Sequence, residues 1–116
     1  MPRFVILTHD YPFLHWDFML EREDCLTTWR LLQQPETDKV IVAERLADHR
    51  KMYLDYEGPV SNDRGEVRRW DGGQFQTLAE SSDCVHVLLE GERLRAEVVI
   101  ENDLESNQWS FRARSS

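Results

Sequence analysis

Three side chains that can bind a metal ion lie close together near the start of the chain: His9, His15 and Asp17. A neutral imidazole offers a nitrogen lone pair, and a carboxylate balances the charge of a divalent cation. Two histidines and one aspartate leave coordination positions open for water and substrate, which is typical of catalytic sites. Mixed nitrogen and oxygen ligands suit Mn²⁺, Zn²⁺ or Fe²⁺. By spacing alone, an ordinary surface pair of His15 and Asp17 remains the alternative, because H-x5-H-x-D is not diagnostic by itself.

The residues around this group predict the strands that carry it. Apolar and polar side chains alternate along residues 14–21, with Met19 as the exception, and such alternation is typical of a half-buried strand. One face would anchor in a core, and the other would display His15 and Asp17 side by side. Residues 4–8 are rich in strand-forming types and predict a buried strand that delivers His9 at its end.

Two further histidines stand outside this group. His49 follows Asp48, and Tyr53 comes four residues later, so an imidazole and a phenol could meet a phosphate or a leaving oxygen as donors. By local pattern alone this signal is weak. His86 has no partner visible in the sequence, and we expect it to be an ordinary polar residue of a late strand.

Length and composition favour one domain, residues 1–116, with a self-sufficient core. The net charge of −8 argues against tight, sequence-independent binding to a long duplex, but not against contact with a nucleic-acid end or a small phosphoester. No apolar run is long enough to cross a membrane. Cys25 and Cys84 form no C-x-x-C pair and no secretory signal is visible, so we expect reduced thiols and a cytoplasmic protein.

The rest of the chain reads as short strands separated by turns. Residues 39–48 suit a strand better than a short helix. Residues 52–56 alternate again, with Tyr53 and Asp55 on one face, and residues 57–65 are the most loop-like stretch. Further strands are expected at residues 26–32, 66–70, 74–78, 84–89, 94–101 and 108–113.

The turn signals predict how these strands connect. An Asp-Gly pair at residues 71–72 between two strand-like runs predicts a hairpin turn at residues 71–73. Ser115 and Ser116 are expected to fray. About nine or ten short strands with frequent turns indicate a mainly β fold, either a small barrel or a sandwich. We predict a small closed antiparallel β-barrel with short loops or helical turns, because closure removes exposed edges.

Several separate stretches of the chain together resemble one family, the 3′-phosphoesterase domain of bacterial ligase D and its stand-alone relatives. They occur in the order found in that family and cover most of the chain, so the combination is much more specific than any one piece. The matching pieces are H-x5-H-x-D-F-x-L-E at residues 9–21, a Trp-centred strand at 26–31, D-H-x3-Y-x-D-x-E-G at 48–58, W-D-x-G at 70–73 and L-x-G-E-R-L at 89–94.

The resemblance implies a compact β-barrel enzyme that depends on a divalent metal, typically Mn²⁺, with Zn²⁺ or another transition metal as alternatives. Enzymes of this family trim the 3′ end of a nucleic acid: they remove a terminal ribonucleoside and then the 3′-phosphate, and leave a 3′-hydroxyl for repair. Carried over by motif, His9, His15 and Asp17 would hold the metal. His49 and Tyr53 would contact the scissile phosphate, and His49 is also a candidate for proton transfer.

The chain departs from the family pattern where the substrate would bind. Two positions after Asp17 the family has an arginine that contacts the phosphate, and here that residue is Met19. By analogy with oxyanion-donor deletions, such a loss could lower the rate about 10²–10³-fold. The Pro-Lys-Gly stretch of the family is replaced by Leu-Leu-Gln-Gln at residues 31–34, and the glycine-rich loop after Gly58 is shorter. The candidate substitute donors are Arg64, Arg68 and Arg69.

Two hypotheses follow from these residues. The first is a metal-dependent phosphoesterase that acts on a nucleic-acid 3′ end or a related small phosphoester, with repair proteins as partners in trans. The second is a non-catalytic metal- or end-binding module of the same fold. Met19 separates the two hypotheses, because the second gains if no other cation reaches the phosphate.

Overall fold

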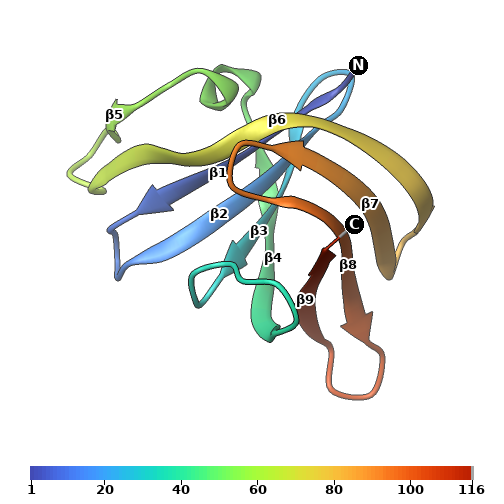
Figure 1. Cartoon of the computed structure of the whole chain (residues 1–116). Helices are drawn as coiled ribbons and strands as arrows, with labels where there is room; N and C mark the ends of the chain where they lie inside the picture. The colour runs from blue at the N-terminus through green and yellow to red at the C-terminus, as the bar shows by residue number, and fades with distance from the viewer. Residues whose placement is uncertain (116) are drawn as a thin grey trace.

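The computed structural model of the chain describes residues 1–115, which form one antiparallel sheet of nine strands (Figure 1). The strands follow the order β1-β2-β3-β4-β9-β8-β7-β6-β5, and β1 also pairs with β6, so the sheet closes on itself in a ring. The predicted mainly β, antiparallel and closed fold is confirmed. The strands are β1 (Arg3–His9), β2 (His15–Glu21), β3 (Leu26–Leu31), β4 (Val40–His49), β5 (Gly58–Pro59), β6 (Glu66–Ser81), β7 (Cys84–Gly91), β8 (Arg95–Asp103) and β9 (Gln108–Ser115).

The interior of the ring holds the larger of two hydrophobic cores. Alternate residues of β1–β4 and β6–β9 point into it, as the pleat of a strand requires. The ring of Phe18 stacks on Trp29 at a centroid distance of 5.9 Å and meets Phe4 and Phe111 edge-on at 6.4 and 5.5 Å. Full burial of a large apolar side chain contributes roughly 1.5–3 kcal/mol. This core therefore makes the ring a rigid support for the outer face.

A second, smaller core lies on the outer face of β1 and β2. Val5 and Met19 point outward from these strands and pack against Leu54 and Val67. Leu54 belongs to a 3₁₀ helix, η1 (Lys51–Leu54), which together with the segment that follows covers this part of the ring. β2 is therefore buried on both faces, which corrects the prediction of a half-buried strand.

The predicted hairpin at residues 71–73 is wrong, because β6 runs straight through it. Its two halves pair with different neighbours, the first with β1 and the second with β7. Asp71 is buried, and its carboxylate accepts the N–H of Gly72 and the N–H groups of residues 92–94 in the β7–β8 turn. A Cβ at Gly73 would lie 2.1 Å from the carbonyl oxygen of Glu90. The small residues thus permit a close strand crossing rather than a turn.

The structure also answers what the sequence left open about residues 40–65 and the chain end. Residues 40–49 are a strand and not a helix. The alternating stretch 52–56 does not extend as a strand, because η1 occupies its first half and buries Leu54 in the smaller core. Within the predicted loop 57–65, only Gly58–Pro59 pair with β6. At the chain end, Ser115 still belongs to β9, and Ser116 lies outside the described residues.

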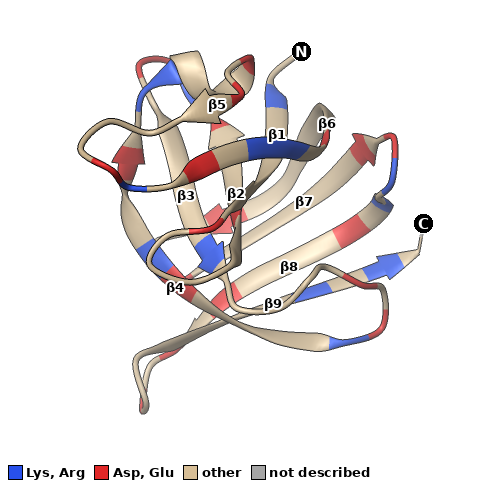
Figure 2. Ribbon diagram, turned by 90° about the vertical axis from the view of Figure 1, so that its left-hand side faces the viewer, with Lys and Arg blue, Asp and Glu red and all other residues tan. Residues whose placement is uncertain are grey.

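Charged residues are spread over the strands and turns rather than gathered in one block (Figure 2). Because there is no single charged face, whether an anion can bind depends on how the basic side chains are arranged locally. Cys25 and Cys84 are free thiols. Within residues 1–115, no helix is long and apolar enough to span a membrane.

Candidate metal centre

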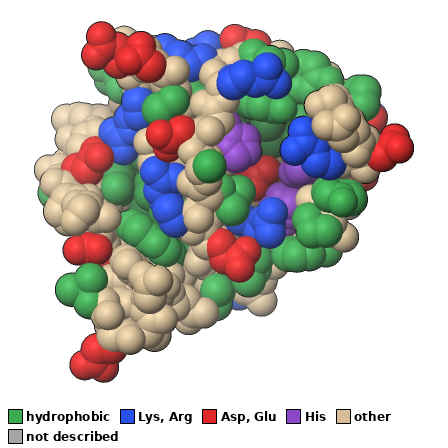
Figure 3. Space-filling view, turned by 180° about the vertical axis from the view of Figure 1, so that it is seen from behind, with side chains coloured by type: hydrophobic (Ala, Val, Ile, Leu, Met, Phe, Trp, Pro, Cys, Tyr) green, Lys and Arg blue, Asp and Glu red, His purple; other side chains and the backbone are tan. Residues whose placement is uncertain are grey.

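His9, His15 and Asp17 converge on the outer face of β1 and β2. His9 ends β1 and His15 begins β2, and the two stand directly opposite each other in the antiparallel register. Asp17 lies on the same face because side chains alternate along a strand. The ligand atoms of the three residues all lie within 4.8 Å of one another. His9 and Asp17 border an open cavity of about 410 Å³, where Figure 3 shows histidine side chains inside a hollow.

Backbone carbonyls fix which nitrogen of each histidine faces Asp17. His15 Nδ1 donates to the carbonyl oxygen of Phe13 at 2.9 Å, and His9 Nε2 donates to that of Arg64 at 2.8 Å. A carbonyl oxygen can only accept, so the opposite nitrogen of each neutral ring carries a lone pair. Those nitrogens, His15 Nε2 and His9 Nδ1, lie 3.1 and 3.4 Å from the two oxygens of Asp17.

Lone pairs therefore face one another at the centre of the group, an arrangement that fits a cation. The contact between His15 Nε2 and Asp17 Oδ1 lacks hydrogen-bond geometry, and neither buried atom has a hydrogen-bond partner among the described residues. A buried polar atom without a partner is costly. A divalent cation would satisfy both atoms at once, and a ligating histidine commonly donates its other N–H to a carbonyl. The donor set thus suits the divalent metal that the family suggests.

The charges of this group also shift its acid–base equilibria. Burial would raise the pKa of Asp17, but the imidazoles of His15 and His9, when they carry a proton toward it, hold that pKa at about 2. Asp17 in turn raises the pKa of His9 above its ordinary value, against the opposing effect of partial burial. Asp17 is therefore ionised at neutral pH, and a proton on His9 competes with a metal ion.

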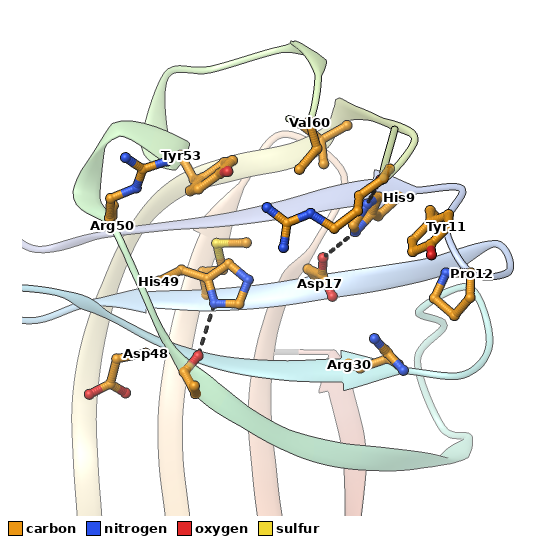
Figure 4. A pocket seen from close by; sticks show the side chains of 14 residues that line it. His9, Tyr11, Pro12, Asp17, Arg30, Asp48, His49, Arg50, Tyr53 and Val60 are labelled. Carbon is orange, nitrogen blue, oxygen red and sulfur yellow. Dashed lines mark hydrogen bonds and ion pairs between the residues drawn. The ribbon is translucent and has the colours of Figure 1, made fainter. Parts of the chain in front are cut away.

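The structure brings His49 and Tyr53 to the same cavity, where Figure 4 shows them across from His9 and Tyr11. His49 ends β4 and Tyr53 lies in η1, so their side chains come from adjacent elements. Their ring centroids are 5.8 Å apart. His49 Nδ1 donates to the carbonyl oxygen of Ala47 at 2.9 Å, which leaves Nε2 of the neutral ring for a substrate.

Three arginines, Arg30, Arg50 and Arg64, also line the cavity. Arg30 stands directly opposite Asp17 in the β2–β3 pairing, so the two side chains share the outer face. The Arg30 guanidinium lies 5.5 Å from the ring centre of Phe13, and its Nη1 lies 3.5 Å from the exposed carboxylate of Glu44, while its buried Nε has no hydrogen-bond partner among the described residues. Guanidinium groups bind phosphate oxygens through charged hydrogen bonds. The cavity therefore combines an acidic floor with a basic rim.

The other two candidate substitute donors do not line this cavity. Arg68 pairs with Glu66 at 2.8 Å on the surface. Arg69 donates to the carbonyl oxygen of Leu54 at 3.3 Å, on the far side of the smaller core. Met19 does border the cavity, but its side chain is nearly fully buried and packs in the smaller core. Position 19 therefore supplies apolar packing where a charged donor was expected.

His86 lies outside the cavity, as its position on a late strand indicated. It has a partner that the sequence did not reveal, because Glu97 of the neighbouring strand lies 2.6 Å from its Nε2. Arg114 lies 3.8 Å from the same carboxylate. This cluster is a cross-strand surface network and shares no residue with the cavity.

Comparison with known proteins decides the family. Residues 7–102 match the model of the DNA ligase D 3′-phosphoesterase domain. The chain belongs to this family. It is also 29% identical, over 102 residues, to the multifunctional non-homologous end joining protein LigD of Pseudomonas aeruginosa. That match covers 79% of this chain but only 12% of the relative, so the chain corresponds to a small part of the larger protein.

Membership of the ligase D phosphoesterase family supports a related phosphoesterase role. Family motifs led directly to five of the residues gathered here, but not to Arg30, Arg50 and Tyr11, which also line the cavity. A signal for Arg30 did exist in the sequence. The polar turn at residues 22–25 sets the β2–β3 register, and that register places Arg30 beside Asp17.

Proposed function

We propose that the protein is a divalent-metal-dependent phosphoesterase that removes a 3′-terminal ribonucleoside, a 3′-phosphate, or both from nucleic-acid ends. One observation carries this proposal: the lone pairs of His9, His15 and Asp17 face one another at the floor of a cavity with arginines at its rim. An acidic floor needs a cation, and a basic rim attracts an anion. A phosphate ester bound to a metal ion satisfies both requirements.

His9, His15 and Asp17 would hold the metal, for which Mn²⁺ is the first candidate and Zn²⁺ the second. When bound, a divalent ion polarises a phosphoryl oxygen and offsets the negative charge that develops during hydrolysis. The residues of the chain prepare this site in advance. The carbonyl oxygens of Phe13 and Arg64 fix both rings, so little reorganisation accompanies binding.

The remaining polar groups of the cavity would bind and orient the phosphate. Arg30 offers a charged donor on the side of His9 and Tyr11, and Arg50 does so on the side of His49 and Tyr53 (Figure 4). Arg64, whose carbonyl oxygen accepts a hydrogen bond from His9, is the third donor of the cavity lining. The Nε2 atom of His49 can exchange a proton with an oxygen of the substrate, while its Nδ1 stays bonded to Ala47. Tyr53 offers a phenolic O–H. We assign His49 and Tyr53 to the catalytic step and the arginines to phosphate binding.

The test uses purified protein, Mn²⁺ and a primer–template that carries either a 3′-phosphate or one 3′-terminal ribonucleotide. We expect metal-dependent formation of a 3′-hydroxyl, and we expect His15→Ala to abolish it. His86→Ala is the matched control, because this histidine lies outside the cavity and should leave the rate unchanged. Absence of a metal-dependent product, or equal rates for wild type and His15→Ala, would overturn the proposal.

The second candidate is a non-catalytic metal- or end-binding module, and Met19 is the observation that favours it. The family's phosphate-contacting arginine is missing at this position, and rim arginines bind phosphate without necessarily aligning it for hydrolysis. This candidate predicts tight binding of a 3′-phosphorylated end in the presence of Mn²⁺ with no product over hours. Partners in trans, such as repair proteins, would then act on the bound end.

A further inference from the structure

The loop between β1 and β2, residues 10–14, exposes apolar side chains at the edge of the cavity. Tyr11, Phe13 and Leu14 have exposed fractions of 45%, 48% and 55%. Large apolar side chains clustered on a surface commonly mark a binding site. The loop joins two metal-site residues, His9 and His15, so anything that it binds must lie beside the proposed reaction centre.

This loop is held in place at both ends. The Asp10 carboxylate accepts the N–H of Glu66 at 2.8 Å, and the Phe13 carbonyl oxygen accepts a hydrogen bond from His15. Beneath the loop lies Gly65, where a Cβ would come within 2.7 Å of the Tyr11 Cβ. An aromatic ring on a fixed loop binds a flat partner at a lower entropic cost than a mobile ring would.

The two rings of the loop have different surroundings. Phe13 meets His15 edge-on at a centroid distance of 5.6 Å and supports the Arg30 guanidinium at 5.5 Å. Tyr11 lines the cavity, yet it makes no side-chain hydrogen bond or ring contact with any other described residue. Figure 4 shows Tyr11 next to His9 and Pro12, with Arg30 below them. The Tyr11 ring is therefore available to a ligand in the cavity.

We infer that Tyr11 is a stacking platform for the nucleobase next to the 3′-terminal phosphate, and that Arg30 contacts the backbone of the same nucleotide. This inference rests on the proposed function for the class of substrate. Aromatic rings interleaved with arginines are the usual means of binding single-stranded nucleic acid. The loop presents this combination at the cavity that would hold the phosphate, so the platform selects an unpaired, base-bearing end.

Charge favours a nucleotide over a protein partner. The chain carries a net charge of −8, yet the lining of this one cavity holds three arginines, Arg30, Arg50 and Arg64, against two aspartates, Asp17 and Asp48. Three basic side chains beside an exposed ring complement a phosphate with an attached base. The exposed apolar patch is also small, since it consists of the loop residues Tyr11, Phe13 and Leu14, and so it suits a nucleotide better than a protein partner.

The test measures binding in EDTA, so that no metal-dependent hydrolysis alters the probe. Fluorescence anisotropy compares two single-stranded oligonucleotides with a 3′-phosphate, one normal and one whose terminal nucleotide lacks its base. We expect wild type to bind the normal end about 5–150-fold more tightly, the range that one base–aromatic stack provides. Tyr11→Ala should remove this difference, and Tyr11→Phe, which keeps the ring, should retain it. Leu104→Ala, at an exposed turn, is the control.

Each outcome bears on one proposal separately. Equal affinities of wild type for the two ends, or an unchanged preference in Tyr11→Ala, would overturn the platform. A preference that depends on Tyr11 in a protein without Mn²⁺-dependent product would support the platform and contradict the proposed hydrolysis. Product formation without any preference for a base would leave the enzyme intact and remove the platform.

Discussion

The two sides of the cavity are built in different ways. The side proposed to hold the metal, called the metal side below, takes His9, His15 and Asp17 from two paired strands, buries His15 and Asp17, and fixes both imidazoles with backbone carbonyls. The substrate side takes its groups mainly from the end of β4, from η1 and from the loop before β6, for example Tyr53 and Arg64. Groups on this side are partly exposed.

This difference shows which part of the site can change without loss of the rest. A ligand set defined by strand register cannot move unless the sheet moves, because a one-residue slip would turn every side chain to the other face. Charged donors on strand ends and loops have no such restriction. Position 19 has changed in another way: it lies in the middle of β2, where the apolar Met19 packs in the smaller core while the proposed ligands His15 and Asp17 stay in place, and Arg30 stands nearby on the next strand.

The largest effect should come from the metal side. Asp17→Asn keeps the shape of the side chain but removes its charge, so we expect Mn²⁺ affinity to fall by more than about 100-fold, beyond the usual effect of residues that only support ligands. Titration of free Mn²⁺ by electron paramagnetic resonance measures this change. Asp48→Asn is the matched control, since Asp48 lines the cavity outside the ligand group. Equal losses in the two variants would contradict the assignment.

The next largest effect should come from the basic rim. Arg30→Met removes a charged donor from the phosphate, and we expect kcat to fall about 10²-fold. Arg30→Lys keeps the charge but loses the planar fork, so part of the rate should return. Steady-state kinetics on a 3′-phosphorylated primer gives both values. Arg68→Met removes a surface charge away from the cavity and serves as control; if it matched Arg30→Met, the effect would reflect overall charge alone.

The metal side should also respond to pH. In the metal-free protein the raised pKa of His9 stabilises the fold below about pH 6.5, and this contribution is lost as pH rises through the raised value. The lowered pKa of Asp17 acts oppositely: its contribution is present above about pH 3.8 and is lost as pH falls towards 2. Metal binding must displace the proton of His9, so Mn²⁺ affinity should rise with pH and then level off.

Two measurements check these pH effects. In urea unfolding of the metal-free protein, His9 should contribute a larger free energy of unfolding at pH 5.5 than at pH 8.5. The difference between the two pH values should therefore be smaller in His9→Asn than in wild type. Mn²⁺ titrations over the same range should show the opposite trend. A metal affinity that did not change with pH would mean that His9 is not a ligand.

The smallest effect should come from Met19. Met19→Leu conserves volume in the smaller core, so we expect a loss of less than about 1.5 kcal/mol in the free energy of unfolding and little change in kcat. Chemical denaturation and steady-state kinetics measure the two quantities. A collapse of activity with an intact fold would show that the thioether itself contacts the substrate, and the division between the two sides would then fail.

Strand periodicity was sufficient to predict most of the ring and the shared face of His15 and Asp17. Prediction from local sequence pattern failed where the same residue types are compatible with two different structures. Asp71, Gly72 and Gly73 are typical of a turn, but here Asp71 binds the β7–β8 turn and Gly73 permits the close crossing, and both depend on partners about twenty residues away. The stretch around Tyr53 alternates like a strand, but burial of Leu54 favours a 3₁₀ turn.

The candidate site divides in the same way. The proposed ligand set follows from short-range spacing, because the register of one hairpin brings His9 and His15 together. Arg30 needed the register of a second strand pair, and Arg50 needed the path of η1. Tyr11 carries no pattern at all, since an exposed tyrosine in a loop becomes meaningful only once the cavity beside it is known. Sequence reasoning missed the residues whose position at the cavity is set by several strand pairings at once.

The carboxylate of Asp71 has a practical consequence for engineering. It collects four backbone N–H groups, three of them from the β7–β8 turn, so an insertion there would pull donors away from a buried charge. Among the described residues, the β8–β9 turn is held only by its own exposed groups, since the Asp103 carboxylate accepts just the N–H of Glu105; this turn exposes Leu104 and lies at the opposite end of the ring from η1 (Figure 1). A fluorophore or fusion partner attached at residues 104–106 should therefore leave both the fold and the cavity undisturbed.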